Sequence, residues 1–230
     1  MCGRYTLTTP GDLLAEELGL DSAPDVAPRY NIAPTQESLI VVQPATDRIA
    51  KKAVWGFGGG RGSLLINARS ETVAKKPAFR DAFVSKRCLI PADGFYEWLG
   101  GRGQRQPIYF SPADRRPMAF AGLWEWLADD PAGFDPAAVF TILTTSANEL
   151  VARVHDRMPV ILDRSSFSLW LNPETPVAEL AGSLVPPPAR ALSHRPVNRA
   201  VNDVRFDSPA CLDPPRELQL DLLTNDRDEL

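Results

Sequence analysis

Short apolar stretches of strand length, separated by polar residues and turn formers, recur along most of this chain. Many carry β-branched and aromatic residues and are bounded by Gly, Pro, Asn or Asp, which is the pattern of a β-strand. The predicted strands are 37–43, 48–55, 88–91, 95–99, 107–111, 118–126 and 139–145, with Asp93-Gly94 as a turn between two of them. Gaps of hairpin length join several strands, which favours antiparallel pairing. The pattern therefore predicts an α+β protein with a mostly antiparallel sheet.

Helix signals are fewer and mark short helices. Thr9 is suited to cap a helix that has Pro10 in its first turn, and Gly19 follows the last turn, where a left-handed residue commonly ends a helix. The predicted apolar face of this helix comprises Leu13, Leu14 and Leu18. Further short helices are predicted from Ser70 to Pro77, over 78–84, from Asn148 to Val154, after Asp163 with Phe167, Trp170 and Leu171 buried, and after Thr175-Pro176.

No internal repeat or long linker divides the 230 residues. We therefore expect one domain over residues 1–215 and a monomeric protein. The segment 190–201 is the last one with a clear pattern of ordered structure. The acidic residues 216–230 are predicted to form a partly ordered tail.

The composition is that of a soluble globular protein, with 44% apolar and 23% charged residues. The formal net charge of −4 argues against a generic cationic nucleic-acid binder. Most basic residues are arginine, however, which suits a local phosphate-binding groove. Three cysteines without close spacing and two histidines argue against a disulfide framework or a metal cluster. With no membrane-length apolar run and no signal-peptide pattern, we expect a cytoplasmic protein with no metal or cofactor.

Cys2 is the first residue with distinctive chemistry. It is small enough for the initiator Met1 to be removed, which leaves a cysteine with a free amine and a thiol on adjacent carbons. The amine has an ordinary pKa of about 8 and the thiol of about 8.5, so modest tuning activates either one. With an aldehyde, the amine forms an imine and the thiol closes a thiazolidine. The alternative is that cysteine is second by accident.

Four later segments carry further candidate groups. Asn67 and Arg69 follow an apolar run, and Glu97 lies among aromatic residues. His155 precedes Asp156, and Thr144-Thr145-Ser146 ends an apolar strand. Three of them have a stated structural alternative: Asn67 in a turn, Glu97 facing solvent, and His155 at a helix C-terminus.

Taken in order, several short motifs resemble the SRAP family of abasic-site processing proteins, which crosslink themselves to damaged single-stranded DNA. The resemblance runs from Cys2 to about Asp207. Its motifs are Met1-Cys2-Gly3-Arg4-Tyr5, Tyr30-Asn31-Ile32-Ala33-Pro34, Trp55-Gly56, Asn67-Ala68-Arg69-Ser70-Glu71-Thr72, the run 94–98 and His155-Asp156-Arg157-Met158-Pro159. Two departures are a short glycine-rich loop over 56–62 and the residues Asn198 and Phe206. The resemblance implies a single domain with a barrel-like β core flanked by short helices.

The resemblance also implies roles for four residues. The Cys2 amine attacks the aldehyde at C1′ of an abasic site. His155, whose ordinary pKa is near 6.5, transfers the proton when water leaves. Burial among aromatic residues would raise the pKa of Glu97. Glu97 handles the proton of the sugar oxygen during ring opening and assists reversal of the crosslink. Asn67 holds the amine or the sugar by hydrogen bonds.

The implied partner is single-stranded DNA with abasic sites near single-strand/double-strand junctions. Trp55 and Trp98 are candidates to stack on flanking bases, with core packing as the alternative for Trp55. The arginines are candidates for phosphate contacts, with solvated surface charges as the alternative. The full predicted DNA-binding set is Arg4, Asn31, Pro34, Trp55, Arg69, Ser70, Arg80, Trp98, Thr144, Thr145 and Arg157.

The sequence is compatible with two other functions. Class II glutamine amidotransferases and related N-terminal-nucleophile hydrolases also begin with Met-Cys-Gly and use a freed cysteine. Their downstream Asn-Gly and Gly-His-Thr-Arg patterns are absent from this chain. A non-covalent single-strand binding module would not need Cys2, Glu97 or His155. Peptidase activity here would mean no more than removal of Met1.

Overall fold

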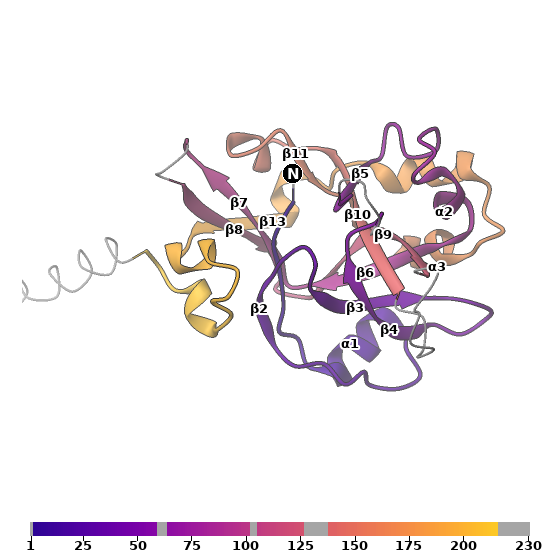
Figure 1. Cartoon of the computed structure of the whole chain (residues 1–230), viewed down its shortest axis with the longest axis horizontal. Coiled ribbons are helices and arrows are strands. Elements are labelled where there is room, and N and C mark those ends of the chain that lie inside the picture. Colours follow the sequence, from indigo (N-terminus) through magenta and orange to yellow (C-terminus); the bar gives the residue numbers. More distant parts are fainter. Residues whose placement is uncertain (1, 59–63, 102–104, 127–137, 216–230) are drawn as a thin grey trace, which may run out of the picture.

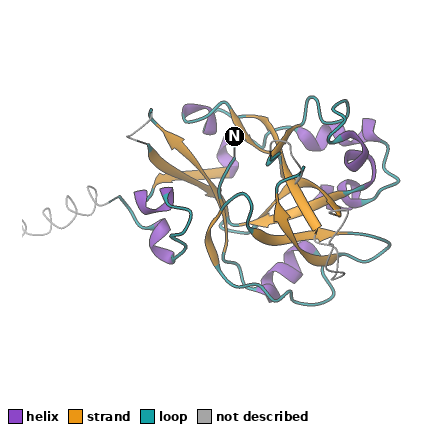
Figure 2. Ribbon diagram, in the orientation of Figure 1, coloured by secondary structure: helices purple, strands orange, loops and turns teal. Residues whose placement is uncertain are grey.

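A computed structural model describes residues 2–58, 64–101, 105–126 and 138–215. Strands form most of the interior, and short helices lie around them (Figure 2). The predicted tail 216–230 and most of the loop 56–62 lie outside the described residues. The strands are β1 (Tyr5–Leu7), β2 (Arg29–Ile32), β3 (Glu37–Val42), β4 (Ile49–Trp55), β5 (Asn67–Arg69), β6 (Arg87–Ala92), β7 (Gly94–Leu99), β8 (Gln106–Pro112), β9 (Met118–Trp126), β10 (Ala138–Ser146), β11 (Arg157–Pro159), β12 (Ile161–Leu162) and β13 (Leu192–Pro196).

Five of these strands close into a barrel. They pair in the order β10-β4-β3-β6-β9, and β9 pairs with β10 to complete the ring. All of these pairings are antiparallel except β4 with β10. Large apolar side chains from the strands fill the centre, including Ile90, Phe120 and Phe140. The predicted α+β fold with a barrel-like, mostly antiparallel core is confirmed.

A second sheet brings the N-terminus into the middle of the molecule. Its order is β13-β8-β7-β1-β2, so β1 lies between two other strands. Tyr5 lies opposite Ile32 on one side and Phe95 on the other. Figure 1 marks the N-terminus near β5 and β11, which belong to the barrel sheet. The residues before β1 are therefore held between the two sheets.

The strands on either side of Asp93-Gly94 are confirmed, but they do not form a hairpin. β6 pairs with β3 and β9 in the barrel, whereas β7 pairs with β1 and β8 in the second sheet. Gly94 suits this crossing, because a Cβ there would lie 2.5 Å from the carbonyl oxygen of Phe110. The carboxylate of Asp93 accepts hydrogen bonds from the hydroxyls of Thr8 and Thr9. The turn thus joins two sheets and anchors the end of β1.

The first helix is confirmed, with corrections at its start and on its face. α1 (Gly11–Leu18) ends at Gly19, whose φ of 67° is left-handed. Pro10 is the N-cap, and Thr9 does not cap the helix because its hydroxyl donates to Asp93. Leu14 and Leu18 are buried, but Leu13 is 48% exposed and lies outside the apolar face.

The remaining helices are short. The N-cap of η1 (Val151–Arg153) is Leu150 rather than the predicted Asn148, but the Asn148 side chain accepts backbone N–H bonds from Leu150 and Val151 at 3.2 and 3.0 Å. The helix predicted from Ser70 is wrong: residues 70–75 form turns, in which the Thr72 carbonyl accepts from the amides of Lys75 and Lys76. Asp163 makes no side-chain cap bond, although Phe167, Trp170 and Leu171 are buried as predicted. The other helical elements are α2 (Arg80–Ser85), η2 (Arg164–Ser166), α3 (Phe167–Leu171), η3 (Val177–Leu184), η4 (Ala189–Ala191), η5 (Arg199–Asn202) and η6 (Pro209–Leu212).

The segment 190–201 was predicted to be the last ordered one, but ordered structure continues beyond it. Residues 197–215 pack on the second sheet. We call residues 197–215 the C-terminal segment. A separate apolar cluster joins it to the sheet, containing Tyr96, Tyr109, Val197, Val201 and Cys211. Within the described residues, no helix is long and apolar enough to span a bilayer.

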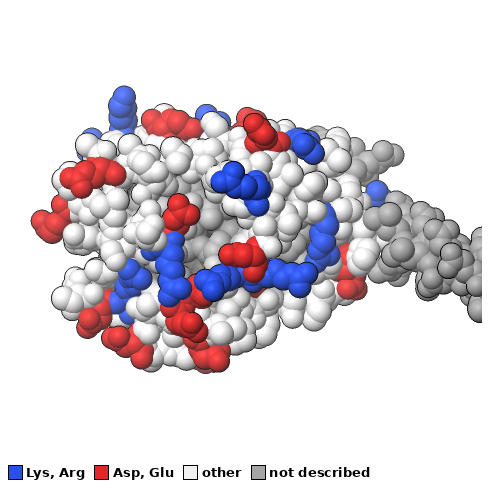
Figure 3. Space-filling view, turned by 180° about the vertical axis from the view of Figure 1, so that it is seen from behind, with Lys and Arg blue, Asp and Glu red and all other residues white. Residues whose placement is uncertain are grey.

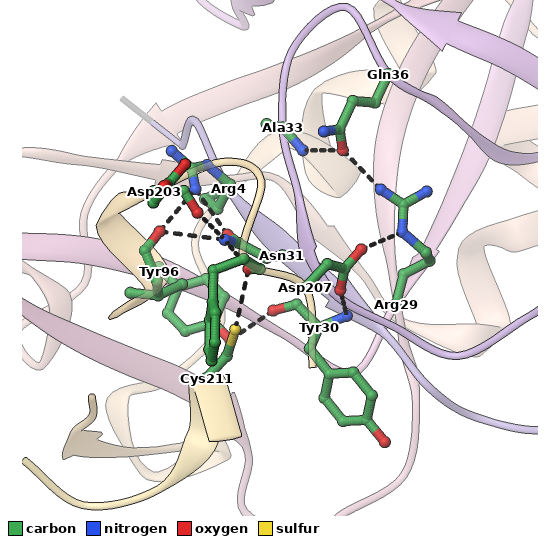
Figure 4. A network of polar contacts seen from close by, with 12 residues as sticks. Arg4, Arg29, Tyr30, Asn31, Ala33, Gln36, Tyr96, Asp203, Asp207 and Cys211 are labelled. Atoms are coloured by element: carbon green, nitrogen blue, oxygen red, sulfur yellow. Dashed lines mark hydrogen bonds and ion pairs between the residues drawn. The ribbon is translucent and has the colours of Figure 1, made fainter. Parts of the chain in front are cut away.

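Asn31 ties the C-terminal segment to β2. Its side-chain amide donates to the carbonyl oxygens of Val201, Asp203 and Phe206 at 3.2, 3.0 and 2.7 Å (Figure 4). Asp207 accepts from the backbone N–H of Tyr30 at 2.6 Å and pairs with the guanidinium of Arg29. One buried amide thus donates to three backbone carbonyls of the C-terminal segment.

We expect Asn31→Ala to lower the free energy of unfolding by about 2–4 kcal/mol, since it removes the donor to three carbonyls of the C-terminal segment and the side-chain acceptor of Arg4. Chemical denaturation measures the loss, and amide exchange should show opening of residues 197–215 first. Asn198→Ala is the matched control, because Asn198 accepts a single bond from the Ala200 amide and should cost about 1 kcal/mol. Equal losses for the two variants would contradict the role given to Asn31.

Candidate active site

A cleft of about 750 Å³ opens where the second sheet meets the barrel, beside the first residues of the chain. Its lining comes from segments far apart in the sequence, including the residues before β1, the loop after β2, β7, and the turn before β11. Five of the predicted site residues line it directly: Arg4, Pro34, Glu97, Trp98 and His155.

Cys2 lies beside this cleft and is completely buried. The pairing of β1 with β7 continues backwards to Arg4, whose carbonyl accepts from the Tyr96 amide at 3.0 Å. On the other side, the Asn67 side chain donates to the carbonyl oxygen of Cys2 at 2.8 Å. Cys2 is therefore held between β7 of one sheet and β5 of the other.

The surroundings of Cys2 keep its thiol protonated. Burial raises the pKa of the thiol far above its usual range, and the nearby carboxyl of Glu97 raises it further. The sulfur lies 3.9 Å from the carbonyl oxygen of Arg4, to which the thiol donates a weak hydrogen bond. This thiol is not a preformed thiolate, so it needs a base, or an electrophile already placed next to it.

Glu97 is placed to exchange protons near neutral pH. It lies on β7 and only 3% of its surface is exposed. Burial raises the pKa of Glu97 to about 7, although the positive charge of the chain's amino terminus opposes the rise. A carboxyl group with this pKa serves either as an acid or as a base under physiological conditions.

We expect Glu97→Gln to reduce the loss of stability at alkaline pH. The pKa of Glu97 rises from 4.5 to about 7 on folding, so the folded chain binds this proton more tightly. The stability that this proton contributes is fully present below pH 4.5 and is lost as the pH rises through about 7. The loss in the free energy of unfolding amounts to about 3 kcal/mol. Urea unfolding at pH 5 and pH 8 measures the difference between variant and parent.

Glu71→Gln is the control of opposite sign for this experiment. The guanidinium of Arg157 lowers the pKa of Glu71 through a side-chain hydrogen bond, so the stability that Glu71 contributes is lost as the pH falls. If Glu97→Gln leaves the pH dependence of unfolding unchanged, the raised pKa of a buried Glu97 carboxyl is contradicted.

His155 can exchange a proton through its ring nitrogens. Its Nδ1 lies 3.0 Å from the backbone nitrogen of Arg157 and 3.0 Å from Oδ1 of Asp156. Accepting from the amide leaves the proton of a neutral ring on Nε2, whereas donating to the carboxylate leaves Nε2 unprotonated. Burial lowers the pKa of His155, and the amino-terminal charge adds to this, while Asp156 opposes it.

A second group of predicted residues lies along the barrel strands next to Asn67. Arg69 ends β5 and lies opposite Thr144 of β10, and Ser70 donates its amide to the Thr144 carbonyl at 2.9 Å. Arg157 makes a two-pronged ion pair with Glu71, at 2.5 and 2.9 Å, and also donates to the Thr144 carbonyl. Thr144 and Thr145 are buried and Arg69 is exposed.

Three predicted residues have other surroundings. Trp55 is fully buried, stacks on Phe140 and donates its indole N–H to the Ile66 carbonyl at 2.8 Å, which matches the core-packing alternative. Asn31 is fully buried in the network described above. Arg80 begins α2 and pairs with Asp81, and α2 packs on β6 and β9 rather than beside the cleft. A DNA contact by any of these three stays a prediction.

Trp98, in contrast, is partly exposed in the cleft and its ring is fixed. Its indole N–H donates to Oδ1 of Asn202 at 2.6 Å, and the guanidinium of Arg4 lies 5.6 Å from the ring centroid. Arg4 is held in turn by Asn31 Oδ1 at 2.7 Å and by the Val201 carbonyl at 2.9 Å. A planar ring held next to a guanidinium is suited to stack on a base.

Three polar residues that line the cleft were not predicted as site residues: Arg105, Arg199 and Asn202. They lie outside the recognised motifs, and only the abundance of arginine hinted at further basic residues in the site. On the face shown in Figure 3, Lys and Arg side chains form a band across the surface, so the net negative charge is not evenly spread. Within the described residues, no group of three or more His, Cys, Asp or Glu is placed to hold a metal ion.

The comparisons with known proteins match nearly the whole chain. The abasic site processing protein YoqW of Bacillus subtilis is 36% identical over 225 residues, covering 93% of this chain and 99% of its own. YedK of Escherichia coli, also named an abasic site processing protein, is 30% identical, covering 93% of this chain and 100% of its own.

Solved structures share the fold. A phage-related protein of Bordetella bronchiseptica superposes with a TM-score of 0.71 at 31% identity, covering 86% of this chain and 95% of its own. A protein of Bacteroides thetaiotaomicron gives a TM-score of 0.80 at 22% identity, covering 93% and 99%. The family model for SOS response associated peptidase (SRAP) matches residues 1–204. Together with the barrel and the cleft at Cys2, this match shows that the chain belongs to the SRAP family.

Proposed function

We propose that this protein captures abasic sites in single-stranded DNA by forming a thiazolidine crosslink through Cys2 after Met1 has been removed. The observation that carries the proposal is the placement of Cys2. It lies between two sheets beside a cleft, with its carbonyl bound by Asn67 and with Glu97 and His155 lining the same cleft. The relatives YoqW and YedK are named abasic site processing proteins, which supports this lesion as the target.

The first step opens the sugar. An abasic site exists mainly as a closed hemiacetal, and the aldehyde appears when the C1′ hydroxyl proton is removed and the ring oxygen receives one. Glu97 carries out this transfer, because a carboxyl with a pKa of about 7 takes and returns a proton at little cost. The product is an aldehyde at C1′ beside the Cys2 amine.

The amine then adds to C1′ and gives a carbinolamine. His155 donates a proton to the departing hydroxyl, which leaves as water and yields the imine. Finally the Cys2 sulfur bonds to C1′, and the thiol proton moves to the nitrogen. The ring therefore forms with net loss of one water, and no oxidant or reductant is required.

The buried thiol explains the order of these steps. Because its pKa is raised, the thiol does not compete with the amine for the aldehyde in solution. It reacts once the imine carbon is held next to it, where proximity replaces thiolate character. An imine at C1′ also acidifies C2′ and invites β-elimination, which would cut the strand. Closing the thiazolidine removes the imine and protects the strand.

The proposed DNA contacts follow the lining of the cleft. Arg4, Pro34 and Trp98 line the cleft that would hold the lesion, whereas Arg69 and Ser70 lie beside Thr144 and Thr145 of β10. Arg157 is paired with Glu71, so a phosphate would have to take over part of that ion pair. A preference for single-strand/double-strand junctions and a monomeric state are further parts of the proposal.

The test is a denaturing gel. Protein whose N-terminal cysteine has been confirmed by mass is mixed with a single-stranded oligonucleotide carrying one abasic site, and with an undamaged strand of the same sequence. The expected result is a slow, heat-stable band only with the lesion, formed without borohydride. If no band appears, the covalent function is wrong; glutamine hydrolysis and unmodified single-strand binding are then the activities to assay.

A further inference from the structure

We propose that Arg105 and Arg199 form a second backbone-phosphate subsite, which holds the DNA strand on one side of the lesion only. The subsite rests on the proposed function and specifies where the strand lies. It requires the single strand to cross the chain's N-terminus, from the β5 side of Cys2 to the β8 side.

The two arginines come from neighbouring elements and line the same cleft as Glu97 and His155. Arg105 directly precedes β8, and Arg199 begins η5 of the C-terminal segment. Arg199 is bonded to the residue that follows Arg105 in the chain: the Gln106 side chain accepts from Nε of Arg199 at 3.3 Å and donates to the Val197 carbonyl at 2.8 Å. Both side chains therefore belong to one wall of the cleft.

Most of the charged side chains that line the cleft are cations. Among the described residues that line the cleft, Arg4, Arg105 and Arg199 are cations and Glu97 is the acidic residue. A guanidinium presents a fork of donors that matches a phosphate, and its charge is permanent. The ligand that suits this wall is a phosphodiester.

A stacking platform lies next to the wall. The ring of Trp98 is fixed through Asn202, which is also on η5 and also lines the cleft. Aromatic rings beside cationic side chains are the usual arrangement in grooves that bind single strands, with bases on the rings and phosphates on the cations. Trp98 would take the base adjacent to the lesion, and the two arginines the phosphates that follow.

The opposite side of Cys2 has its own cation. Asn67 binds the Cys2 carbonyl, and Arg69, two residues further along β5, is exposed. Cys2 thus lies between Arg69 on the barrel side and the Arg105–Arg199 wall on the side of the second sheet. A strand whose lesion reaches Cys2 then has one flank on each side, so each group of arginines should sense one flank.

The experiment uses two short oligonucleotides with a tetrahydrofuran abasic analogue, which lacks the C1′ hydroxyl and does not crosslink. One carries nucleotides only on the 5′ side of the analogue, and the other only on the 3′ side. Arg105→Gln with Arg199→Gln should weaken binding to one of them about tenfold and to the other less than about twofold. On the affected strand, the slope of log affinity against log salt should fall by about 1.4, for two lost phosphates.

Arg69→Gln should show the opposite flank preference. Arg116→Gln with Arg190→Gln removes the same two charges from a different groove and should change neither affinity. Equal weakening of both strands by the Arg105/Arg199 variant, or no weakening, would overturn the subsite. Crosslinking of a natural abasic strand, measured in parallel, reports on the proposed function separately. If the crosslink is absent but the Arg105/Arg199 variant still weakens binding to one strand only, the covalent function is overturned and the subsite is supported.

Discussion

Changing Cys2 to Ala is expected to abolish the heat-stable crosslink and to convert the product into a cleaved strand. Removal of Met1 from this variant leaves a free alanine amine, which still forms an imine at C1′. Without a sulfur the imine is not trapped, so β-elimination proceeds. A denaturing gel with a strand labelled at the 5′ end measures both products at once, the slow protein-bound band and the shortened strand.

Two variants make the comparison specific to the sulfur of Cys2. Cys2→Ser keeps the size and the amine but replaces the thiol by a weaker nucleophile, so it should behave like Cys2→Ala. Cys88→Ala removes another fully buried thiol from the barrel core and should leave the crosslink intact. A heat-stable band of full intensity from Cys2→Ala, without borohydride, would show that the linkage is not a thiazolidine.

Glu97→Gln is expected to slow crosslinking at pH 8 by about 100-fold or more, within the usual range for loss of a general acid/base. The carboxylate that takes the C1′ hydroxyl proton becomes the main form above a pH of about 7, because burial raises the pKa of Glu97 to about 7. The rate for the parent protein should therefore rise through pH 7. The Cys2 amine, with an ordinary pKa of about 8, adds a second rise in both proteins.

Single-turnover rates between pH 6 and pH 9 separate the two contributions. The ratio of parent to variant rates should increase up to about tenfold from pH 6 to pH 8 and then level off. Glu125→Gln is a matched control, because burial also raises the pKa of Glu125, but this residue lies on β9 away from the cleft. A ratio that does not change with pH would assign the proton transfer to a group other than Glu97.

The hydrogen bonds of Asn31 show that a residue in a site motif can also have a structural role. Asn31 and Pro34 were both predicted to contact DNA, and Pro34 lines the cleft. Asn31 is buried, donates to three carbonyls of residues 201–206 and holds Arg4. It thereby positions the wall that carries Arg199 and Asn202. Nothing in the local sequence distinguishes a buried residue that holds two segments together from a residue that binds a ligand.

The pattern along the chain was sufficient to place most of the strands and the first helix. Strand periodicity and helix caps are local properties, determined by residues a few positions apart, and β9 was predicted with its observed bounds of Met118 and Trp126. The candidate chemistry at Cys2, Glu97 and His155 was also visible, because those residue types stand in recognisable short motifs.

Only the tertiary structure decided how these pieces meet. β6 and β7 are joined by a tight turn and look like a hairpin in the sequence, but they belong to different sheets. The tertiary structure also placed Trp55 in the core and Trp98 in the cleft, and brought Arg105 and Arg199 to one wall. Such contacts join residues as many as 197 positions apart, as in the bond from Arg4 to the Val201 carbonyl. They depend on sheet order and register, which are set by packing of the whole core rather than by any local stretch.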